Sequence, residues 1–478
     1  MSSSSPSVIV LPAAPEMPSI ASAALDAVAV PSRAPPVRLL LAGTHPHQSN
    51  GYSRVVYELM LRLAKRDDIK LTLYAFQRGP VRPQDAERPI PPNVTVFDAA
   101  SAENPKRAGF NEAFFGEFLR RDPQDVVVVY NDLSVVAMLT DNMREHHPKE
   151  RDERPFAFVC YLDQVYPTQK KRYLDMLSRD FDGIIAFTEE WKRTIQAQLP
   201  PDVDRRMAWS TLPHGLDPQH SFPVTRRLAR HYFGLPQDAF VVLNVNRNVP
   251  RKRYDHVMMA YARMAAEVEK AGPSARPVRF VIATAMHGCW DLPEIFESEC
   301  VRLGMAPETC RKYLVGLSNP QAMSDRDVNI LHSAADVHFS MADGEGFGLC
   351  SLESAAVGVA NVATAVGGIH AYLDDQSALL VRPKWEFYVS NIRDNIGGRA
   401  EVSDPADGAA ALLRYYRDET LRAEHGRKSR ERIIKSGDFD WDVLAARFAN
   451  YVLDTHRAHQ ASRKPDSDVS GGEIGKKS

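Results

Sequence analysis

The sequence predicts an α/β protein with two Rossmann-like, doubly wound domains that face each other across a cleft. Short apolar blocks alternate with helical patterns along the chain, which is typical of parallel β-α-β units. The alternation stops at a polar, proline-containing stretch over residues 217–224 and then starts again. The chain has 478 residues, enough for two or three domains with buried cores. Ligands of doubly wound folds bind at the carboxyl ends of the strands, so we expect one between the two halves.

The first half begins with an apolar strand at residues 37–41, which runs into a glycine loop and a helix at residues 53–66. The same patterns predict strands at residues 70–76, 93–97, 125–130, 155–161 and 183–187, and helices at residues 110–121, 133–146 and 189–199. We therefore expect residues 36–217 to form the first domain. Residues 1–35 are rich in Ser, Ala and Pro, which predicts a disordered tail.

The second half repeats the alternation over residues 218–435. Strands are predicted at residues 240–246, 278–283, 312–315, 336–340, 359–363 and 378–381, and helices at residues 254–271, 324–334, 349–357 and 405–418. A last helix is expected at residues 440–453, within a C-terminal segment over residues 436–456. Residues 457–478 are polar and predict a second disordered tail.

The composition excludes several classes of protein. Lysine and arginine total 59 and aspartate and glutamate 61, so the basic excess of a nucleic-acid-binding protein is absent. The five cysteines include no C-x-x-C pair, which argues against a zinc site or a disulfide framework and favours a reducing compartment. Proline and acidic residues interrupt the apolar part of residues 8–30, so we predict neither a signal peptide nor a membrane span and expect a cytoplasmic protein.

The most informative segment is a glycine-rich turn, which reads DGEGFGLCSLE over residues 343–353 and follows the strand expected at residues 336–340. Glycines allow close approach of the backbone, and the helix that begins near Leu349 offers free N–H groups, so the segment predicts a phosphate site. Two carboxylates, Glu345 and Glu353, bracket it eight positions apart. Carboxylates accept hydrogen bonds from vicinal hydroxyls, which suits a sugar at one end and a ribose at the other.

A second motif, NRNVPRKR over residues 246–253, follows the strand expected at residues 240–246. Basic side chains at the carboxyl end of a strand can neutralise a pyrophosphate. Arg247 and Lys252 are the candidates for this role, whereas Arg251 and Arg253 are expected at the surface. A solvated basic turn is the alternative for the whole motif.

These two motifs together resemble those of retaining family-4 glycosyltransferases, which have the GT-B fold. Glu345 and Glu353, with seven residues between them, match the E-x7-E signature of that family, and Arg247 and Lys252 match its Arg and Lys five positions apart. The resemblance implies that Glu345 contacts the donor sugar, Glu353 the ribose, and Arg247 and Lys252 the diphosphate. It assigns backbone contacts with sugar and phosphate to the turn residues Gly346, Phe347, Gly348 and Leu349.

Further candidates lie in loops after predicted strands. The family places a glycine loop near the donor phosphates and the acceptor, and Gly51 is the best match; Arg54, next to it, either faces phosphate or lies exposed. Many relatives carry a histidine after the strand that ends at residue 161, and this chain has none there. Asp163 is the candidate for a polar group that faces the acceptor or the donor sugar. The alternative for Asp163 is that it caps a helix. Leu317 and Ser318 stand where relatives hold the base.

The resemblance implies structural roles for three more segments. One of them, residues 436–456 with the helix expected at residues 440–453, crosses back to the first domain. His214, in the stretch Pro213–Asp217, is expected to lie in the connection between the domains, with catalysis as the weaker alternative. The pair Gly367-Gly368 is expected to permit close packing behind the donor pocket.

The resemblance implies a donor, UDP- or GDP-sugar, as co-substrate, no other cofactor, and no metal because basic residues replace it. The acceptor would be a hydroxyl of a glycan, a glycoconjugate or a lipid-linked molecule, and no nucleic acid partner is expected. The phenylalanine-rich helix expected at residues 110–121, which Lys106-Arg107 precede, either packs on the sheet, which we favour, or makes a peripheral membrane contact.

Two other functions are alternatives to the glycosyltransferase. A nicotinamide or flavin enzyme requires G-x-G-x-x-G after the first strand, and the loop over residues 43–54 lacks it. A non-catalytic protein that binds nucleotide sugars or acts as a scaffold on the same fold stays open as the alternative to the glycosyltransferase. The oligomeric state is not predicted.

Overall fold

A computed structural model describes residues 34–78, 88–102, 114–217, 220–317 and 323–463 of the chain. The described residues from Pro36 onward belong to one compact unit. Most of both predicted tails, at residues 1–33 and 464–478, lies outside the described residues.

The first half contains a seven-stranded sheet in which every pair of neighbours is parallel, in the order β3-β2-β1-β4-β5-β6-β7. Its strands are β1 (Val37–Thr44), β2 (Ile69–Phe76), β3 (Thr95–Asp98), β4 (Val126–Asp132), β5 (Ala157–Asp163), β6 (Gly183–Ala186) and β7 (Ala208–Thr211). Almost every side chain of β1, β4 and β5 is buried, which explains their continuous apolar sequences. The order reverses between β1 and β4, where the loops that follow these strands diverge.

The second half repeats this topology with six parallel strands in the order β10-β9-β8-β11-β12-β13. They are β8 (Phe240–Asn244), β9 (Val278–Ile282), β10 (Leu314–Gly316), β11 (Val337–Ser340), β12 (Ala360–Thr364) and β13 (Leu379–Val381). Both sheets therefore have the doubly wound strand order, and their order reverses at β1/β4 and at β8/β11.

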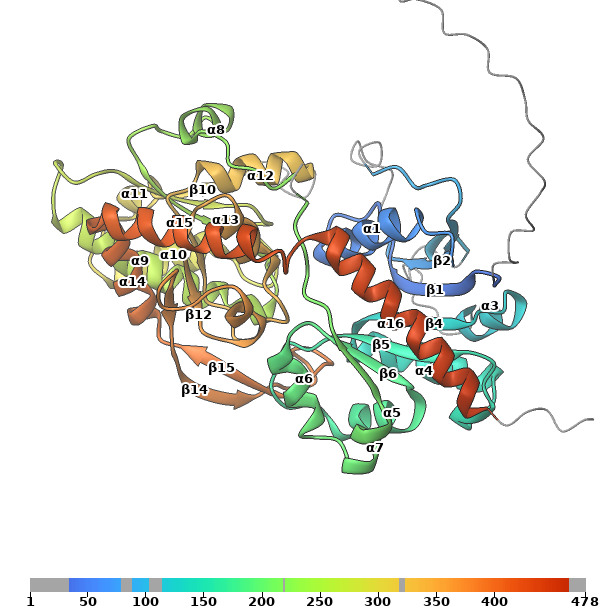
Figure 1. The fold of residues 1–478 in the computed structure, drawn as a ribbon. Helices are drawn as coiled ribbons and strands as arrows, with labels where there is room; N and C mark the ends of the chain where they lie inside the picture. Colours follow the sequence, from blue (N-terminus) through green and yellow to red (C-terminus); the bar gives the residue numbers. More distant parts are fainter. Residues whose placement is uncertain (1–33, 79–87, 103–113, 218–219, 318–322, 464–478) are drawn as a thin grey trace, which may run out of the picture. The chain divides into compact units, whose positions relative to one another are not determined.

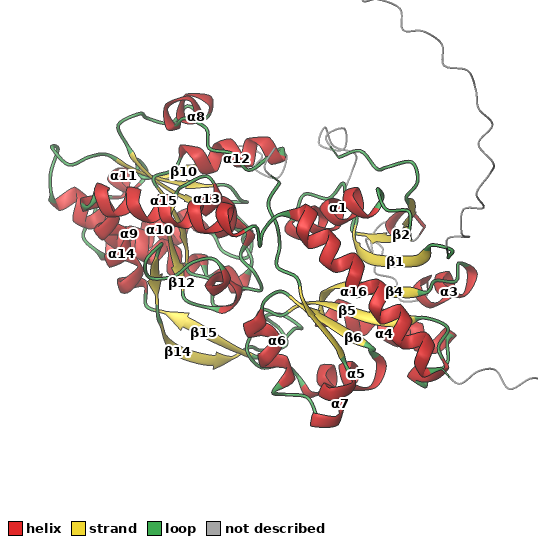
Figure 2. Ribbon diagram, viewed as in Figure 1, coloured by secondary structure: helices red, strands yellow, loops and turns green. Residues whose placement is uncertain are grey.

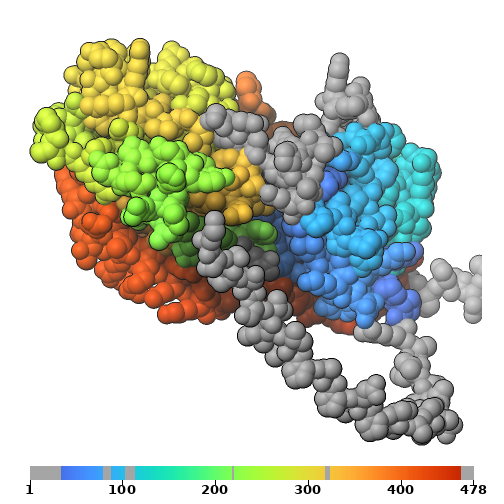
Figure 3. All heavy atoms as spheres, turned by 90° about the horizontal axis from the view of Figure 1, so that it is seen from above, coloured from blue at the N-terminus to red at the C-terminus, as the bar shows by residue number. Residues whose placement is uncertain are grey.

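Helices connect the strands and cover the sheets (Figures 1 and 2). In the first half they are α1 (Gly51–Leu63), α2 (Ala99–Ala102), α3 (Phe115–Arg121), α4 (Leu133–His146), α5 (Lys171–Asp180), α6 (Glu189–Gln196) and α7 (Pro201–Arg206). In the second half they are α8 (Arg226–Tyr232), α9 (Tyr254–Lys270), α10 (Leu292–Arg302), α11 (Pro307–Cys310), α12 (Asp325–Ala334), α13 (Leu349–Ala356), α14 (Pro405–Arg417) and α15 (Glu419–Ser436). The short helix α8 lies on the surface in Figure 3, where Leu228 and Tyr232 are exposed.

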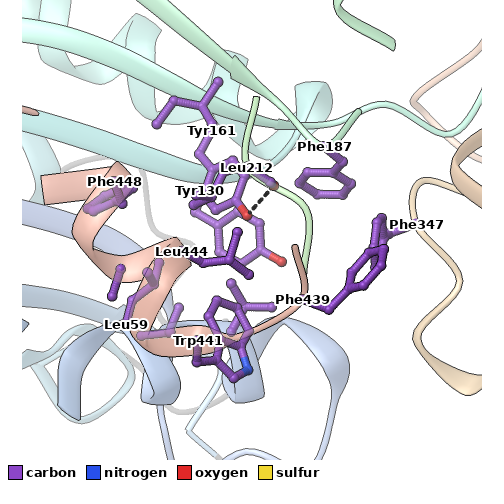
Figure 4. Packing of buried hydrophobic residues seen from close by; sticks show 14 of the residues in the cluster. Leu59, Tyr130, Tyr161, Phe187, Leu212, Phe347, Phe439, Trp441, Leu444 and Phe448 are labelled. Atoms are coloured by element: carbon purple, nitrogen blue, oxygen red, sulfur yellow. Dashed lines mark hydrogen bonds between the residues drawn. The ribbon is translucent and has the colours of Figure 1, made fainter. Parts of the chain in front are cut away.

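The last helix, α16 (Trp441–Ser462), returns to the first half and packs against α1, β1, β4 and β5. Leu444 and Phe448 of this helix join Leu59 and Tyr161 in one buried cluster, as Figure 4 shows. The helix extends to Ser462, so the first residues of the predicted C-terminal tail are helical instead. The two segments that link the halves also meet, because the Leu216 amide donates to the Phe439 carbonyl at 2.8 Å.

Several elements differ from the sequence prediction. An antiparallel hairpin, β14 (Pro383–Tyr388) and β15 (Arg399–Ser403), was not predicted, because its strands alternate too weakly and Trp385 and Tyr388 are exposed. Helix α3 begins at Phe115, and residues 110–113 of the predicted helix are outside the described part of the chain. Phe115 and Leu119 are buried against the first sheet, which agrees with the favoured packing on the sheet. No described helix combines the length and the apolar character needed to cross a bilayer.

Candidate functional site

A cavity of about 680 Å³ lies at the carboxyl ends of strands from both sheets. This volume is in the range of pockets that hold nucleotide-sized ligands. Its walls come from the loops after β1, β5, β8, β9 and β11, together with the beginnings of α1, α12 and α13. The cavity thus forms where the doubly wound order of the sheets predicts a ligand.

The glycine-rich turn after β11 forms one wall of the cavity. Gly348 adopts φ of +86°, which favours glycine, and leads directly into α13. The Leu349 and Cys350 amides, at the first turn of α13, donate no hydrogen bond to any described residue. Free amides at a helix N-terminus attract anions, so the turn can bind a phosphate through its backbone.

The turn is held in place from both halves of the chain. Trp191 of α6 donates its indole N–H to the Gly346 carbonyl at 2.7 Å, and the Tyr372 hydroxyl donates to the Gly348 carbonyl at 2.6 Å. Behind the turn, a Cβ on Gly368 would lie 2.1 Å from the Gly346 carbonyl oxygen, so no larger residue fits there. The expected role of Gly367-Gly368 in close packing agrees with this geometry.

Lys252 and Glu345 form a buried ion pair at the edge of the cavity. The Lys252 ammonium contacts one Glu345 carboxylate oxygen, and the Arg251 guanidinium lies 3.5 Å from the same oxygen. Burial opposes ionisation of Glu345, but Lys252 and Arg251 outweigh it and hold the pKa of Glu345 below its ordinary value. Glu345 is therefore charged at neutral pH and can accept hydrogen bonds from hydroxyl groups.

Arg247 differs from these residues because it is exposed and free. It lines the cavity, yet its side chain makes no hydrogen bond or ion pair with any described residue. Arg247 and Lys252, predicted as partners, therefore reach the same cavity from the loop after β8, one free and one paired. Arg251 and Arg253 were expected at the surface, but both side chains are mostly buried, and Arg253 binds Asp255 at 2.8 Å. Arg251 lies in the short turn Pro250–Lys252, and Arg253 follows it directly.

Glu353, the second carboxylate of the motif, lies on the first turns of α13 and is already paired. One oxygen contacts the Arg54 guanidinium, and the other lies 3.5 Å from the His332 ring. Arg54 also donates a hydrogen bond to Asp325 at 2.8 Å. Arg88 donates to both carboxylate oxygens of Asp325, at 2.7 and 2.9 Å. Neither reading of Arg54 from the sequence included this network, which joins residues far apart in the chain.

Asp163 lies at the end of β5, where its side chain is buried next to the turn. Tyr52 donates its hydroxyl to one carboxylate oxygen, whereas the other oxygen is buried without a partner among the described residues. Burial raises the pKa of Asp163 and Arg251 offsets part of this effect. Asp163 does not cap a helix, so the alternative reading of this residue is not supported by its position.

His214 also lines the cavity, between the rings of Phe187 and Phe347 at 4.3 and 5.0 Å. The Tyr130 hydroxyl lies 3.3 Å from its Nε2 atom, and its Nδ1 atom is buried without a partner in the described structure. Burial lowers the pKa of His214 to about 3, so the ring is neutral at physiological pH.

The remaining candidates are only partly brought together. Gly51 is the first residue of α1 and borders the cavity, and a Cβ there would lie 2.8 Å from the Leu349 side chain. Leu317 does not line the cavity; its side chain packs in a separate apolar cluster. Ser318 falls outside the described residues.

One group of side chains in the described structure has the spacing of metal ligands, although the sequence predicted none. Ligand atoms of Glu58, Asp217 and His220 all lie within 4.8 Å of one another. None of the three lines the large cavity, and Glu58 is bound to Arg62. The group therefore offers nothing to a ligand in the cavity.

The chain matches no protein-family model. Among curated proteins it is similar to D-inositol 3-phosphate glycosyltransferases. The protein from Geodermatophilus obscurus is 28% identical over 60% of this chain and 55% of its own length. The protein from Stackebrandtia nassauensis is 32% identical over 52% of this chain and 51% of its own length. The chain thus spans about half the length of the curated relatives it matches.

Solved structures share the fold over most of the chain. Sucrose-phosphate synthase from Thermosynechococcus elongatus aligns with a TM-score of 0.63 and 16% identity, over 88% of this chain and all of the other. Anabaena Alr3699/HepE in complex with UDP and glucose aligns with a TM-score of 0.59 and 16% identity, over 87% of this chain and all of the other. The predicted fold is confirmed: the chain has two Rossmann-like domains and the GT-B fold, and the proteins that it is similar to include glycosyltransferases.

Proposed function

We propose that the chain is a retaining family-4 glycosyltransferase that moves a sugar from a nucleotide-diphosphate sugar to a hydroxyl acceptor. One observation carries the proposal: Arg247, Lys252, Glu345 and Glu353 reach a single cavity together with the free amides that open α13. This set of groups suits a diphosphate flanked by a sugar and a ribose.

In the proposed reaction, the bond between the donor sugar and the diphosphate breaks and negative charge grows on the leaving group. Arg247, Lys252 and the amides of Leu349 and Cys350 stabilise that charge, usually the largest electrostatic contribution to such a step. Glu345 holds hydroxyls of the donor sugar, with the Gly346, Phe347 and Gly348 backbone beside it. The cations take the place of a metal ion, so the proposed reaction is metal-independent.

Asp163 is proposed to orient the acceptor hydroxyl or a hydroxyl of the donor sugar. Its unpartnered oxygen, buried beside Gly346, supports this role, because a buried acceptor without a partner is costly unless a ligand satisfies it. The acceptor is a carbohydrate, a glycoconjugate or a lipid-linked molecule. In this proposal residues 36–217 hold the acceptor, residues 218–435 hold a UDP- or GDP-sugar, and residues 217–224 act as the hinge for closure around the donor.

Arg247→Met provides the test, because Arg247 is exposed and bound to no described residue, so its loss leaves the fold intact. A panel of UDP- and GDP-sugars is screened by thermal shift, and product formation is measured with acceptors that include D-inositol 3-phosphate. We expect the wild type to be stabilised by one donor class and to form product. Arg247→Met should weaken donor binding at least tenfold, because a hydrogen bond to a charged group is lost.

Arg227→Met is the matched control, since Arg227 is an exposed arginine of α8 that does not line the cavity. Equal donor binding by Arg247→Met and the wild type would contradict the proposed site. A wild type that binds donor but forms no product, and hydrolyses none, would instead establish a non-catalytic nucleotide-sugar-binding protein.

A further inference from the structure

Arg54, which forms an ion pair with Glu353, lies where it could bind the donor. Arg54 lies one turn after Gly51, which opens α1, and both residues border the cavity. The start of α1 touches the start of α13, because a Cβ on Gly51 would lie 2.8 Å from the Leu349 side chain. Arg54 is therefore next to the free amides that the proposed function assigns to the diphosphate.

The hydrogen bonds of Arg54 leave part of its guanidinium unused. One terminal nitrogen contacts Glu353 and the other binds Asp325 at 2.8 Å. The Nε–H is buried and has no acceptor among the described residues. A buried donor without an acceptor is unfavourable, so a ligand oxygen beside it would be stabilised.

Asp325 is fixed more firmly than Glu353. Arg88 holds both of its carboxylate oxygens, at 2.7 and 2.9 Å, and is itself anchored on the Pro46 carbonyl at 2.8 Å. Burial opposes ionisation of Asp325, but Arg54 and Arg88 outweigh it and lower its pKa strongly. Asp325 can therefore keep one nitrogen of Arg54 while the other nitrogen leaves Glu353.

We infer that Arg54 exchanges partners when the donor binds. In the free protein Arg54 neutralises Glu353; ribose hydroxyls then take over the Glu353 carboxylate, and Arg54 turns about Asp325 to bind the diphosphate through its released nitrogen and its Nε–H. The inference rests on the proposed function, which assigns Glu353 to the ribose. Arg54 thereby competes with the nucleoside and assists the phosphates.

The exchange makes opposite predictions for the two parts of a nucleotide. In Arg54→Gln, a nucleoside should bind about fivefold more tightly, because an ion pair no longer competes for Glu353. The second quantity is the gain in affinity from adding the diphosphate, expressed as the ratio of the nucleoside Kd to the nucleoside diphosphate Kd. This ratio should fall about tenfold in Arg54→Gln, because a charged hydrogen-bond donor is lost.

Isothermal titration calorimetry with uridine and UDP, and with guanosine and GDP, measures both quantities. Arg62→Gln is the control, because Arg62 lies on the same helix and forms ion pairs with Glu58 and Asp442 outside the cavity. It should match the wild type in both quantities. In the background of Glu353→Gln, adding Arg54→Gln should give no gain in nucleoside affinity, because the freed carboxylate is absent.

The outcomes separate the inference from the proposed function. A wild type that binds none of the four compounds contradicts the proposed function. A wild type that binds them, with either quantity unchanged in Arg54→Gln, overturns the exchange. If Arg54→Gln does not fold, as judged by circular dichroism, Arg54→Lys replaces it, because lysine keeps a cation for Asp325 but replaces the planar two-nitrogen fork and its Nε–H with a single nitrogen. It should show the same two changes.

Discussion

Three cations of one short loop differ in their environment at the cavity. Arg247 is exposed and free, Arg251 lies against Glu345, and Lys252 is buried in an ion pair. Spacing identified Arg247 and Lys252, but nothing in the sequence separates a free cation from a paired one. Arg247 precedes the turn over Pro250–Lys252, whereas Arg251 and Lys252 lie within it. Charge runs therefore predict a basic site better than they predict which residue is available to a ligand.

His214 provides a prediction at this scale. The unfolded chain binds a proton at His214 near pH 6.5, whereas burial delays protonation in the folded chain to about pH 3. Stability therefore falls as the pH falls from 6.5 to 3. His214→Gln should lose about 2 kcal/mol less of its free energy of unfolding than the wild type between pH 7 and pH 5.

Chemical denaturation of both proteins at the two pH values measures this difference. His220→Gln is the control, because His220 is half-exposed and paired with Asp217, so its loss should not reduce the sensitivity to acid in the same way. Identical pH dependence in the wild type and in His214→Gln would show that His214 is accessible to protons in the folded chain.

At the scale of secondary structure, the sequence predicted the two sheets well. The predicted bounds of all strands of the second sheet, and of all strands of the first except β7, agree with the structure within a few residues. Fully buried parallel strands have continuous apolar sequences, which makes them easy to predict. The short helices α2, α7 and α11 were missed, and so were α5, α8, α10 and α15. Charged residues interrupt the apolar stripes of α5, α8, α10 and α15. In α15 few positions are buried, so the hydrophobic pattern that would predict a helix is weak there.

Helix α16 carries the prediction at this scale. Phe448 is buried between α16 and the first sheet, so Phe448→Ala should lower the free energy of unfolding by about 3–5 kcal/mol through lost burial and a new cavity. Val443, on the same helix, is 47% exposed. Val443→Ala should change stability by less than about 0.5 kcal/mol.

Urea denaturation followed by tryptophan fluorescence compares these variants, since Trp441 belongs to the same helix. Equal stability of the two variants would mean that α16 does not cover the first sheet in solution.

At the scale of the whole molecule, the contacts between the halves explain what the sequence could not predict. Arg54, Arg88 and Asp325 meet across more than 230 positions of the chain, and Trp191 reaches Gly346 across 155. Such pairs carry no local signature, because each residue taken alone resembles an ordinary surface or capping residue. The motifs of the cavity were predictable from local pattern, and the network that holds them was not.

This arrangement predicts how a ligand changes hydrogen exchange. UDP or GDP, whichever binds, should slow amide exchange both in residues 51–54 and in residues 345–353, because both segments line the same cavity. At one hundred times its Kd, the ligand should also raise the free energy of unfolding by about 2.7 kcal/mol. Helix α10 does not line the cavity and is the internal reference.

Exchange measured by mass spectrometry with and without the nucleotide tests the prediction. Protection confined to residues 345–353 would show that the first half takes no part in binding.

The return of α16 decides how this protein can be taken apart. A fragment that stops at residue 217 would leave Leu59 and Tyr161 without the helix that shields them, and would be expected to aggregate. Any chimera that exchanges the first half with that of another protein must therefore carry residues 441–462 along with it. The first half and residues 441–462 form one structural unit that two separate stretches of the gene encode. Fusing residues 441–462 directly to the first half would encode that unit in one continuous stretch.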